Sequence, residues 1–290
     1  IDQVNLPGGA ANLVFGNPEE QIDVIMRSDH VRKVSFTGSL EVGKTIMAKA
    51  SASLKKVSLE LGGHAPFIIF ADVDPAEAAS KATYSKFRNM GQVCISPSRF
   101  LVHRSVVEEF TDLAVREVKN FRLGYGLEEG VTHGPLQSAD QVRRAEELVA
   151  DIEQKGGRIL AGGRRPENLK KGFFFEPTIA TDISPDMRLM QEEPFAPILP
   201  IIPFDTEEEA IRMANDTPYG LAAYVLTHDL RTAVMACESL EAGIIALNDT
   251  SPATSCCPFG GMKQSGIGRE GWHEGLEAYY ETKYVSLLLD

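Results

Sequence analysis

The sequence predicts an α/β protein built on a largely parallel sheet. Short apolar runs rich in β-branched and aromatic residues alternate along the chain with helical stretches of about 10 to 18 residues. Clear helix-start signals separate these runs, and a hydrophobic content of 43% over 290 residues is enough to bury a sizeable core. Strands joined by helices in this order are typical of parallel sheets.

The expected strands follow from runs that are too short for helices and are bounded by turn residues. Glycine pairs punctuate the chain in the same way, with Gly162-Gly163 turning it after a four-residue strand. The strands are expected at residues 34–36, 66–70, 100–103, 158–161, 173–178, 199–203 and, at the end of the chain, 284–289. The last of these is either an edge that seeks a partner chain or the final core strand of the same chain.

The expected helices are marked by their first residues. Capping boxes pair an N-cap residue with a carboxylate three positions later, at Asp74 with Glu77, Ser105 with Glu108, and Thr206 with Glu209. A long helix begins after Ser138 and ends at Gly156-Gly157. Another begins near Glu41, directly after the first strand.

Composition limits the classes of partner. The 29 basic and 41 acidic residues give a net charge of -12, so we expect neither nucleic acid nor a membrane as a partner, but a small molecule. No apolar run approaches about 20 residues, and we expect a protein without a leader sequence, in the cytoplasm. The four cysteines have neither disulfide density nor zinc-site spacing, so we expect reduced thiols and no metal.

The chain opens on Ile1-Asp2-Gln3 rather than on methionine, and Leu6-Pro7-Gly8-Gly9 reads like the middle of a longer protein. We therefore expect a fragment.

The stretch VSFTGSLEVGKT, residues 34–45, matches the phosphate-loop pattern of nucleotide hydrolases. A loop that wraps a triphosphate needs small residues without negative charge, whereas this one contains Leu40, Glu41 and Val42. We expect instead that the helix that follows points its N-terminus at another phosphate.

Three stretches carry candidate chemistry. Glu60 lies between apolar neighbours before a double glycine, where burial would favour the neutral carboxylic acid; the alternative is a structural hydrogen bond at a strand end. Cys94 lies in a loop between a helix and a strand, where it is either reactive or inert. Residues 258–271 are too rich in glycine for an ordinary linker.

Together these motifs resemble the aldehyde dehydrogenase superfamily, and in particular the succinate-semialdehyde and related semialdehyde dehydrogenases. The family patterns FTGS, ELGG, GQxC, EEPF and PFGGxKxSGxGREG are matched at residues 36–39, 60–63, 91–94, 192–195 and 258–271, and Glu60 precedes Cys94 by 34 residues as in the family. The resemblance covers essentially the whole chain. It implies the C-terminal part of an NAD(P)-binding domain (1–61), a catalytic α/β domain (62–263) and a return segment with an oligomerisation strand (264–290).

The resemblance also implies a mechanism. The Cys94 thiolate would attack the aldehyde carbon, with its own backbone N–H as one oxyanion donor, and Glu60 would activate the water that hydrolyses the thioester. Because only a few per cent of an ordinary thiol is ionised at pH 7, we expect the site to raise that fraction.

The implied cofactor is NAD or NADP, bound by the helix that follows FTGS. Lys44-Thr45 is then a coincidence. Glu193 would hold the nicotinamide ribose, Phe195 would pack on the cofactor and Leu61 would approach the nicotinamide amide. The remaining residues expected on the cofactor are Thr37, Gly38, Ser39, Gly43 and Gly62.

On the substrate side the resemblance points to Arg88, whose guanidinium could hold the carboxylate of a short semialdehyde. The alternative is a helix-end arginine on the surface. Phe259 would line the pocket. The serine of the family's NxxxxS stretch is Ala253 here, so the neighbouring Thr254 is the expected substitute. The second cysteine that some relatives carry two residues after the nucleophile is Ser96 here, so we expect no disulfide switch at that position.

Two other classes remain open. A cysteine hydrolase or acyltransferase could use Cys94 with Glu60, although such nucleophiles usually pair with a histidine, and His64 is the nearest. An inactive fragment with a structural or oligomeric role is the other. In the resembling family the first half of the dinucleotide-binding domain, including the residues that distinguish NAD from NADP, lies before Ile1. We therefore expect the chain alone neither to bind the cofactor tightly nor to turn over.

Two further expectations concern assembly and redox chemistry. We expect a homodimer or homotetramer formed through the terminal strand. The adjacent Cys256 and Cys257 either only pack or have a redox role.

Overall fold

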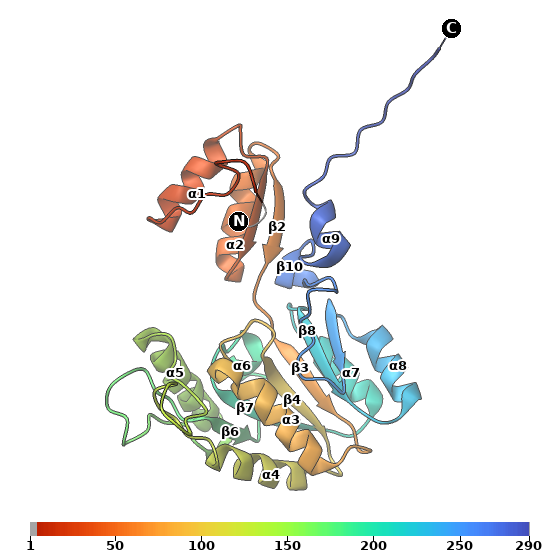
Figure 1. Ribbon diagram of the computed structural model, residues 1–290. Helices are drawn as coiled ribbons and strands as arrows, with labels where there is room; N and C mark the ends of the chain where they lie inside the picture. The colour runs from red at the N-terminus through yellow and green to blue at the C-terminus, as the bar shows by residue number, and fades with distance from the viewer. Residues whose placement is uncertain (1–4, 290) are drawn as a thin grey trace.

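The structure, a computed structural model, describes residues 5–289 (Figure 1). Its strands form two sheets. A seven-stranded sheet has the order β5-β6-β7-β4-β3-β8-β9, and a three-stranded sheet has the order β1-β2-β10. In the large sheet only β5 runs antiparallel to its neighbour, so the predicted α/β fold with a largely parallel sheet is confirmed.

The strands are β1 (Lys33–Thr37), β2 (Lys56–Glu60), β3 (Ala65–Ile69), β4 (Pro97–His103), β5 (Arg158–Ala161), β6 (Thr178–Thr181), β7 (Ile198–Phe204), β8 (Ala222–Leu226), β9 (Ile244–Leu247) and β10 (Gly266–Ile267). The α-helices are α1 (Pro18–Arg27), α2 (Leu40–Ser51), α3 (Pro75–Phe87), α4 (Val107–Lys119), α5 (Ala139–Gln154), α6 (Arg188–Gln191), α7 (Glu207–Asn215), α8 (Leu230–Ser239) and α9 (Trp272–Glu277). Two short 3-10 helices are η2 (Arg88–Gly91) and η3 (Lys263–Ser265).

The large sheet is buried on both faces, as strand β3 illustrates. Phe67 and Ile69 pack in one cluster with residues of α3 and α4, whereas Ile68 and Phe70 pack in another with residues of α7 and α8. Successive side chains of a strand point to opposite faces, so an apolar run without alternation requires helices on both sides.

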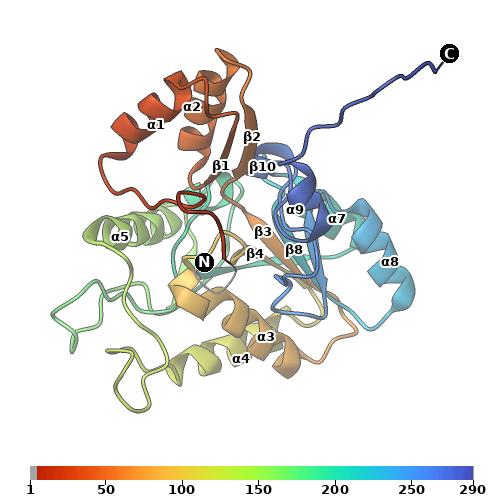
Figure 2. The ribbon, with the colours of Figure 1, turned by 45° about the horizontal axis from the view of Figure 1, so that its top comes forward.

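The small sheet stands apart from the large one, with α1 and α2 on its outer side (Figure 1). Its core is a separate cluster that includes Met26 of α1, Ile46 of α2 and Leu59 of β2. The chain returns to this sheet near its end, where β10 pairs antiparallel with β2 and places Gly266 opposite Glu60. The last segment then leaves the body of the molecule (Figure 2).

Most of the expected helix starts are confirmed. Asp74 accepts a hydrogen bond from Ala76 N (2.7 Å), and Thr206 accepts one from Glu209 N (3.2 Å), so both are N-caps. The prediction of a capping box at Ser105 is wrong. Its hydroxyl pairs with His103 Nδ1 (2.8 Å), and α4 begins later, at Val107.

Two expected strands differ. Residues 173–177 are not a strand, and β6 begins only at Thr178 because Pro177 has no N–H to donate to a ladder. The terminal run 284–289 pairs with no strand of the described chain, and Tyr284 and Leu288 are each 88% exposed. The alternative of a final core strand within the chain is therefore wrong.

The phosphate-loop interpretation is also excluded. Helix α2 already begins at Leu40, so the segment that would have to wrap a triphosphate is helical. Thr45 lies inside this helix, where its hydroxyl donates to Glu41 O (3.0 Å). Only Gly38 and Ser39 lie between β1 and α2, so the connection is a tight turn.

Within residues 5–289, no helix combines the length and the apolar character that a membrane crossing requires.

Candidate active site

A cavity of about 640 Å³ lies between the two sheets and contains most of the expected site residues. Its walls come from the β1–α2 turn, the end of β2, the loop before β4 and the segment after α6. The residues that line it are Thr37, Gly38, Ser39, Leu40, Glu41, Glu60, Leu61, Gly62, Val93, Cys94, Gln141, Arg144, Glu192, Glu193, Phe195 and Tyr219.

The β1–α2 turn gives one wall of the cavity an anion-binding character. Ser39 is the N-cap of α2, and its hydroxyl accepts from Val42 N (3.4 Å). Gly38 N donates to Glu60 O (3.0 Å), which ties this turn to the end of β2. The N-terminus of a helix carries unpaired N–H groups and a positive dipole end, which favour phosphate.

Gly43 allows α2 to pack closely on the end of β2. A Cβ at this position would lie 2.5 Å from Leu61 Cδ2, so no larger residue fits without moving Leu61. Gly43 itself does not line the cavity; its part is to seat the helix that does.

Glu60 ends β2 as a buried carboxylate, 4% exposed, and neither oxygen has a hydrogen-bond partner in the described structure. Burial raises its pKa to about 7, with the charge of Glu270 adding to the rise and that of Arg269 opposing it. The predicted shift toward the neutral acid is confirmed, and the alternative of a structural hydrogen bond is wrong. A carboxyl group that titrates near pH 7 can act as a general base.

Cys94 lies in the loop between η2 and β4, partly buried, with a free thiol. Burial raises its pKa, and the charges of Glu193 and Glu60 raise it further, while the backbone N–H groups of Ile95 and Cys94 act in the opposite direction. The expectation that the site increases the ionised fraction is therefore wrong for the described residues. Two carboxylates and an apolar environment dominate, and both oppose a second negative charge.

The Cys94 loop has an unusual backbone. Asn89 and Met90 adopt φ values of 50° and 56°, and Gly91 follows at 75°. A Cβ on Gly91 would lie 2.4 Å from Ala196 O, so the turn packs directly against the segment that carries Glu193. Left-handed conformations at non-glycine residues are strained and persist only where the surroundings fix them.

Glu193 is held in place from the opposite wall. Its Oε1 accepts from Gly63 N (3.1 Å), and Arg144 Nη2 donates to its backbone carbonyl (2.6 Å). A Cβ on Gly62 would lie 2.3 Å from Glu193 Oε2, so glycine is required for the carboxylate to take this position. Phe195 follows with a φ of 47°. Burial raises the pKa of Glu193, against the effects of its hydrogen bond from Gly63 and of Arg144.

The sequence patterns did not point to Lys86, which is 1% exposed. Its Nζ lies 3.3 Å from where a Cβ of Gly91 would be, beneath the Cys94 loop. Burial lowers its pKa to about 7, and the charge of Glu193 opposes this effect. A lysine in the last turn of a helix is ordinarily exposed, so no local signal could have identified it.

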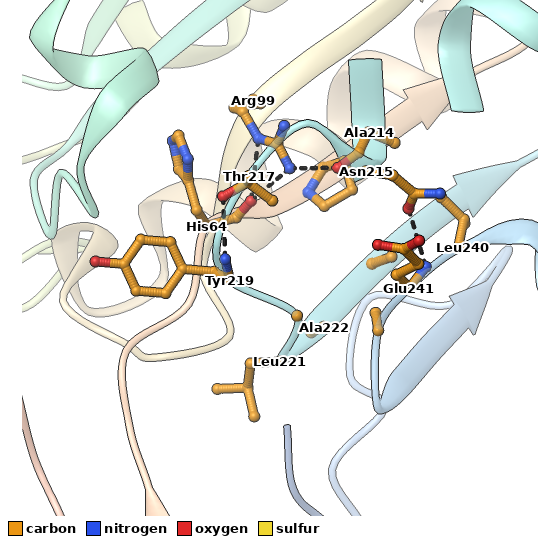
Figure 3. A pocket seen from close by; sticks show the side chains of 14 residues that line it. His64, Arg99, Ala214, Asn215, Thr217, Tyr219, Leu221, Ala222, Leu240 and Glu241 are labelled. Atoms are coloured by element: carbon orange, nitrogen blue, oxygen red, sulfur yellow. Dashed lines mark hydrogen bonds between the residues drawn. The ribbon is translucent and has the colours of Figure 1, made fainter. Parts of the chain in front are cut away.

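His64 does not face the thiol. It is 2% exposed, its Nε2 contacts Leu189 O (3.0 Å), and burial holds its pKa well below the usual range. It lies on a separate small cavity beside Arg99, whose Nη2 donates to His64 O (2.9 Å) and to Ala214 O (2.7 Å) (Figure 3). His64 and Arg99 therefore belong to the packing between β3, β4 and α7. His64 does not pair with the Cys94 thiol.

The expected substrate residues lie outside the Cys94 cavity. Arg88, at the end of α3, is exposed and lines a neighbouring cavity of about 440 Å³. Burial raises the pKa of Tyr224, the charge of Arg88 opposes this effect and that of Cys94 adds to it, so both residues lie near this tyrosine. Thr254 is exposed and contacts Cys256 Sγ (3.2 Å). Phe259 packs against the same core cluster as Cys94.

Comparison with known proteins decides the family. The profile described as "Aldehyde dehydrogenase family" matches residues 1–285. The chain belongs to the aldehyde dehydrogenase family.

Relatives within the aldehyde dehydrogenase family differ in their named substrates. Over 98% of its length the chain is 44% identical to a mitochondrial succinate-semialdehyde dehydrogenase of Oryza sativa subsp. japonica. It is 41% identical over 99% of its length to a 3-sulfolactaldehyde dehydrogenase of Pseudomonas putida. It covers 54% of the first of these and 58% of the second, so it spans about half the length of the curated relatives it matches.

Solved structures agree with the fold. An E. coli NADP-dependent enzyme superposes with a TM-score of 0.95 at 40% identity, covering 98% of this chain and 59% of that one. A succinate-semialdehyde dehydrogenase from Burkholderia pseudomallei superposes with a TM-score of 0.92 at 41% identity, covering 96% and 57%.

Proposed function

We propose that the protein carrying this sequence oxidises a short carboxylated aldehyde, such as succinate semialdehyde, to the carboxylic acid with NAD or NADP. The observation that carries this proposal is the single cavity that holds the Cys94 thiol, the unpaired Glu60 carboxyl group and the N-terminus of α2. These are a nucleophile, a base that titrates near neutral pH and a phosphate-binding helix end.

In the proposed mechanism Cys94 adds to the aldehyde carbon and forms a thiohemiacetal. The backbone N–H groups of Cys94 and Ile95, which already lower the pKa of the thiol, are the donors available to the oxyanion. After oxidation to the thioester, the Glu60 carboxylate takes a proton from a water molecule, which attacks the acyl carbon and releases the acid. No residue between 5 and 289 donates to Glu60, so within this part of the chain it is free to accept that proton.

The residues present fit a nicotinamide dinucleotide. The α2 N-terminus, with Ser39 as its N-cap, suits the pyrophosphate, and Gly38 in the preceding turn lies against Phe36 with no side chain in the way. Glu193, fixed by Gly63 N, suits a ribose hydroxyl. When bound, the cofactor would supply the hydride acceptor. The relatives include two with NADP(+) in their names, and the solved neighbours include complexes with NAD+, so both cofactors stay in the proposal.

The proposed substrate class rests on Arg88 and on relatives named for succinate semialdehyde in Oryza sativa and Acinetobacter baylyi. A guanidinium six residues before the nucleophile, which like Cys94 lies near Tyr224, can pair with the far carboxylate of a short chain. Other relatives are named for 3-sulfolactaldehyde, which is also anionic, and for aminoaldehydes, so the charge at the far end of the substrate is the property to test.

The test compares succinate semialdehyde with butanal, an uncharged aldehyde of the same chain length, by following NADH or NADPH absorbance in the protein carrying this sequence. We expect a kcat/KM for succinate semialdehyde at least about tenfold higher, and Arg88→Gln to remove this preference through KM while leaving butanal unchanged. Equal kcat/KM values for the two aldehydes would contradict the substrate class. Ester hydrolysis without any reduction of NAD or NADP would support the hydrolase alternative.

We further propose a homodimer or homotetramer joined through the exposed residues 284–289, which light scattering of a truncation at residue 283 would test. The domain limits 1–61, 62–263 and 264–290 and a cytoplasmic location belong to the same proposal. Some relatives are named mitochondrial or peroxisomal, so fractionation of the source cells is the test of location.

A further inference from the structure

An exposed pair of cysteines lies outside the proposed chemistry. Cys256 and Cys257 are adjacent in sequence, both are exposed, and both carry free thiols. Thr254 Oγ1 lies 3.2 Å from Cys256 Sγ. The contact with Thr254 and then the neighbouring Cys257 lower the pKa of Cys256, whereas burial and then the charge of Cys256 raise the pKa of Cys257. Cys256 is thus the thiol that ionises first, and the sulfur of Cys257 is next to it in the chain.

The pair is connected to the proposed base through the backbone. Cys257 O lies 2.9 Å from where a Cβ of Gly271 would be, so the two chain segments are in contact there. One turn of chain further, Phe259 and Glu270 exchange two backbone hydrogen bonds of 2.7 Å each. Glu270 in turn is the charge that adds to the raised pKa of Glu60. A change in the backbone at the cysteines therefore reaches the group that tunes Glu60.

We infer that Cys256 and Cys257 form a redox pair that a peroxide closes into a vicinal disulfide, and that closure disturbs the Phe259–Glu270 bridge beside Glu60. The second half of this inference rests on the proposed function, because it requires Glu60 to be the base. The first half does not.

The chemistry balances with peroxide as the oxidant. The Cys256 thiolate attacks one peroxide oxygen and the O–O bond breaks, which gives a sulfenic acid and hydroxide. The hydroxide takes up the proton that the thiol released and becomes water. The Cys257 sulfur then attacks the Cys256 sulfur, the S–O bond breaks, and the disulfide forms with release of a second water. Two thiols lose two electrons and two protons in total, and the peroxide is reduced to water.

The geometry of adjacent cysteines makes such a disulfide a switch rather than a permanent bond. Consecutive Cα atoms are about 3.8 Å apart across a trans peptide. Disulfides usually join Cα atoms at least about 4.4 Å apart, so closure must distort the peptide between the two cysteines. A strained disulfide at the surface is more easily reduced than an unstrained one.

The first experiment uses the Cys94→Ser variant of the protein carrying this sequence, so that the nucleophile does not react. The protein is treated with one equivalent of hydrogen peroxide, alkylated and cleaved after glutamate. Glu238 and Glu241 lie between the pair and Cys237, so this cleavage separates them. Cys237 is exposed and isolated, which makes it the control thiol of the same sample.

We expect the peptide with Cys256 and Cys257 to lose two hydrogens and to regain them with dithiothreitol, while Cys237 shows no such loss. Cys256→Ser and Cys257→Ser should each abolish the loss; both positions are exposed, so the fold should tolerate them. Addition of oxygen at Cys256 without loss of hydrogen, or a disulfide from either cysteine to another chain, would overturn the inference.

The second experiment tests the link to Glu60 in the protein carrying this sequence. After equal peroxide treatment, the unmodified protein should have a kcat about tenfold below that of Cys256→Ser, with a shifted acid limb of the pH profile and recovery in dithiothreitol. Peroxide oxidises Cys94 equally in both samples, so this oxidation does not change the ratio of the two kcat values. Equal kcat values, with the disulfide present by mass, would overturn the link to Glu60 and leave the proposed function intact.

Discussion

Glu60 and Glu193 are two buried carboxylates that line one cavity, and they differ in what surrounds their oxygens. Glu193 accepts a backbone hydrogen bond from Gly63 and lies near Arg144 and Lys86. Glu60 has no donor at either oxygen among the residues that the structure describes. Burial raises the pKa of both groups. The comparison teaches that burial alone does not define a role: a carboxylate with a donor is fixed in position, and one without is free to take a proton.

The largest effect is expected from removing the base. Glu60→Gln keeps the shape of the side chain but cannot accept a proton, so steady-state acid formation should fall by about 10²- to 10⁴-fold. The first turnover, which needs only Cys94 and the cofactor, should remain as a burst of NADH or NADPH in stopped-flow absorbance. Loss of burst and steady state together would assign Glu60 to the nucleophile step instead.

The next effect tests whether Glu193 must be fixed. In Gly62→Ala the new Cβ would lie 2.3 Å from Glu193 Oε2 and must displace it. We expect KM for the cofactor to rise about tenfold with a smaller change in kcat, measured by initial rates. Gly8→Ala is the matched control, because nothing lies within 4 Å of a Cβ there. An unchanged KM in Gly62→Ala would mean that the position of Glu193 does not matter.

A smaller effect separates the charges of the two carboxylates. Glu193→Gln keeps an oxygen for Gly63 N but removes the negative charge that, after burial, contributes most to the raised pKa of Cys94. We expect iodoacetamide to alkylate Cys94 about three- to tenfold faster at pH 7, read by peptide mapping. Glu60→Gln should accelerate the reaction less. The reverse order would mean that Glu60 is the carboxylate that controls the thiol.

The smallest effect is on stability. The pKa of Glu60 is raised to about 7 in the folded protein, from 4.5. Between these values the folded state binds more protons than the unfolded state, so stability falls as pH rises through this window. Because glutamine does not titrate, the stability of the Glu60→Gln variant does not fall in this way as pH rises. Its melting temperature should exceed that of the parent by about 2–4 °C at pH 8 and by less at pH 5, by calorimetry. A gap that does not change with pH would contradict the raised pKa.

Sequence patterns predicted the parallel sheet, the buried Glu60 and most helix starts, because these depend on local apolar runs and on caps such as Asp74. They failed where a distant or competing partner decided the outcome. The Ser105 hydroxyl pairs with His103 instead of capping a helix. The pKa of Cys94 is raised by two carboxylates that lie 34 residues before it and 99 residues after it in the sequence. The buried position of Lys86 likewise depends on Gly91 and Ala196, which the helix pattern does not contain.

The most direct test of the central claim is the intact mass of the Glu60→Gln variant after mixing with aldehyde and NAD or NADP, followed by an acid quench and peptide mapping. The account predicts that the acyl group accumulates as a thioester on Cys94, because nucleophile and hydride transfer remain while the base is gone. A protein that reduces the cofactor but carries no acyl group on Cys94 would contradict it.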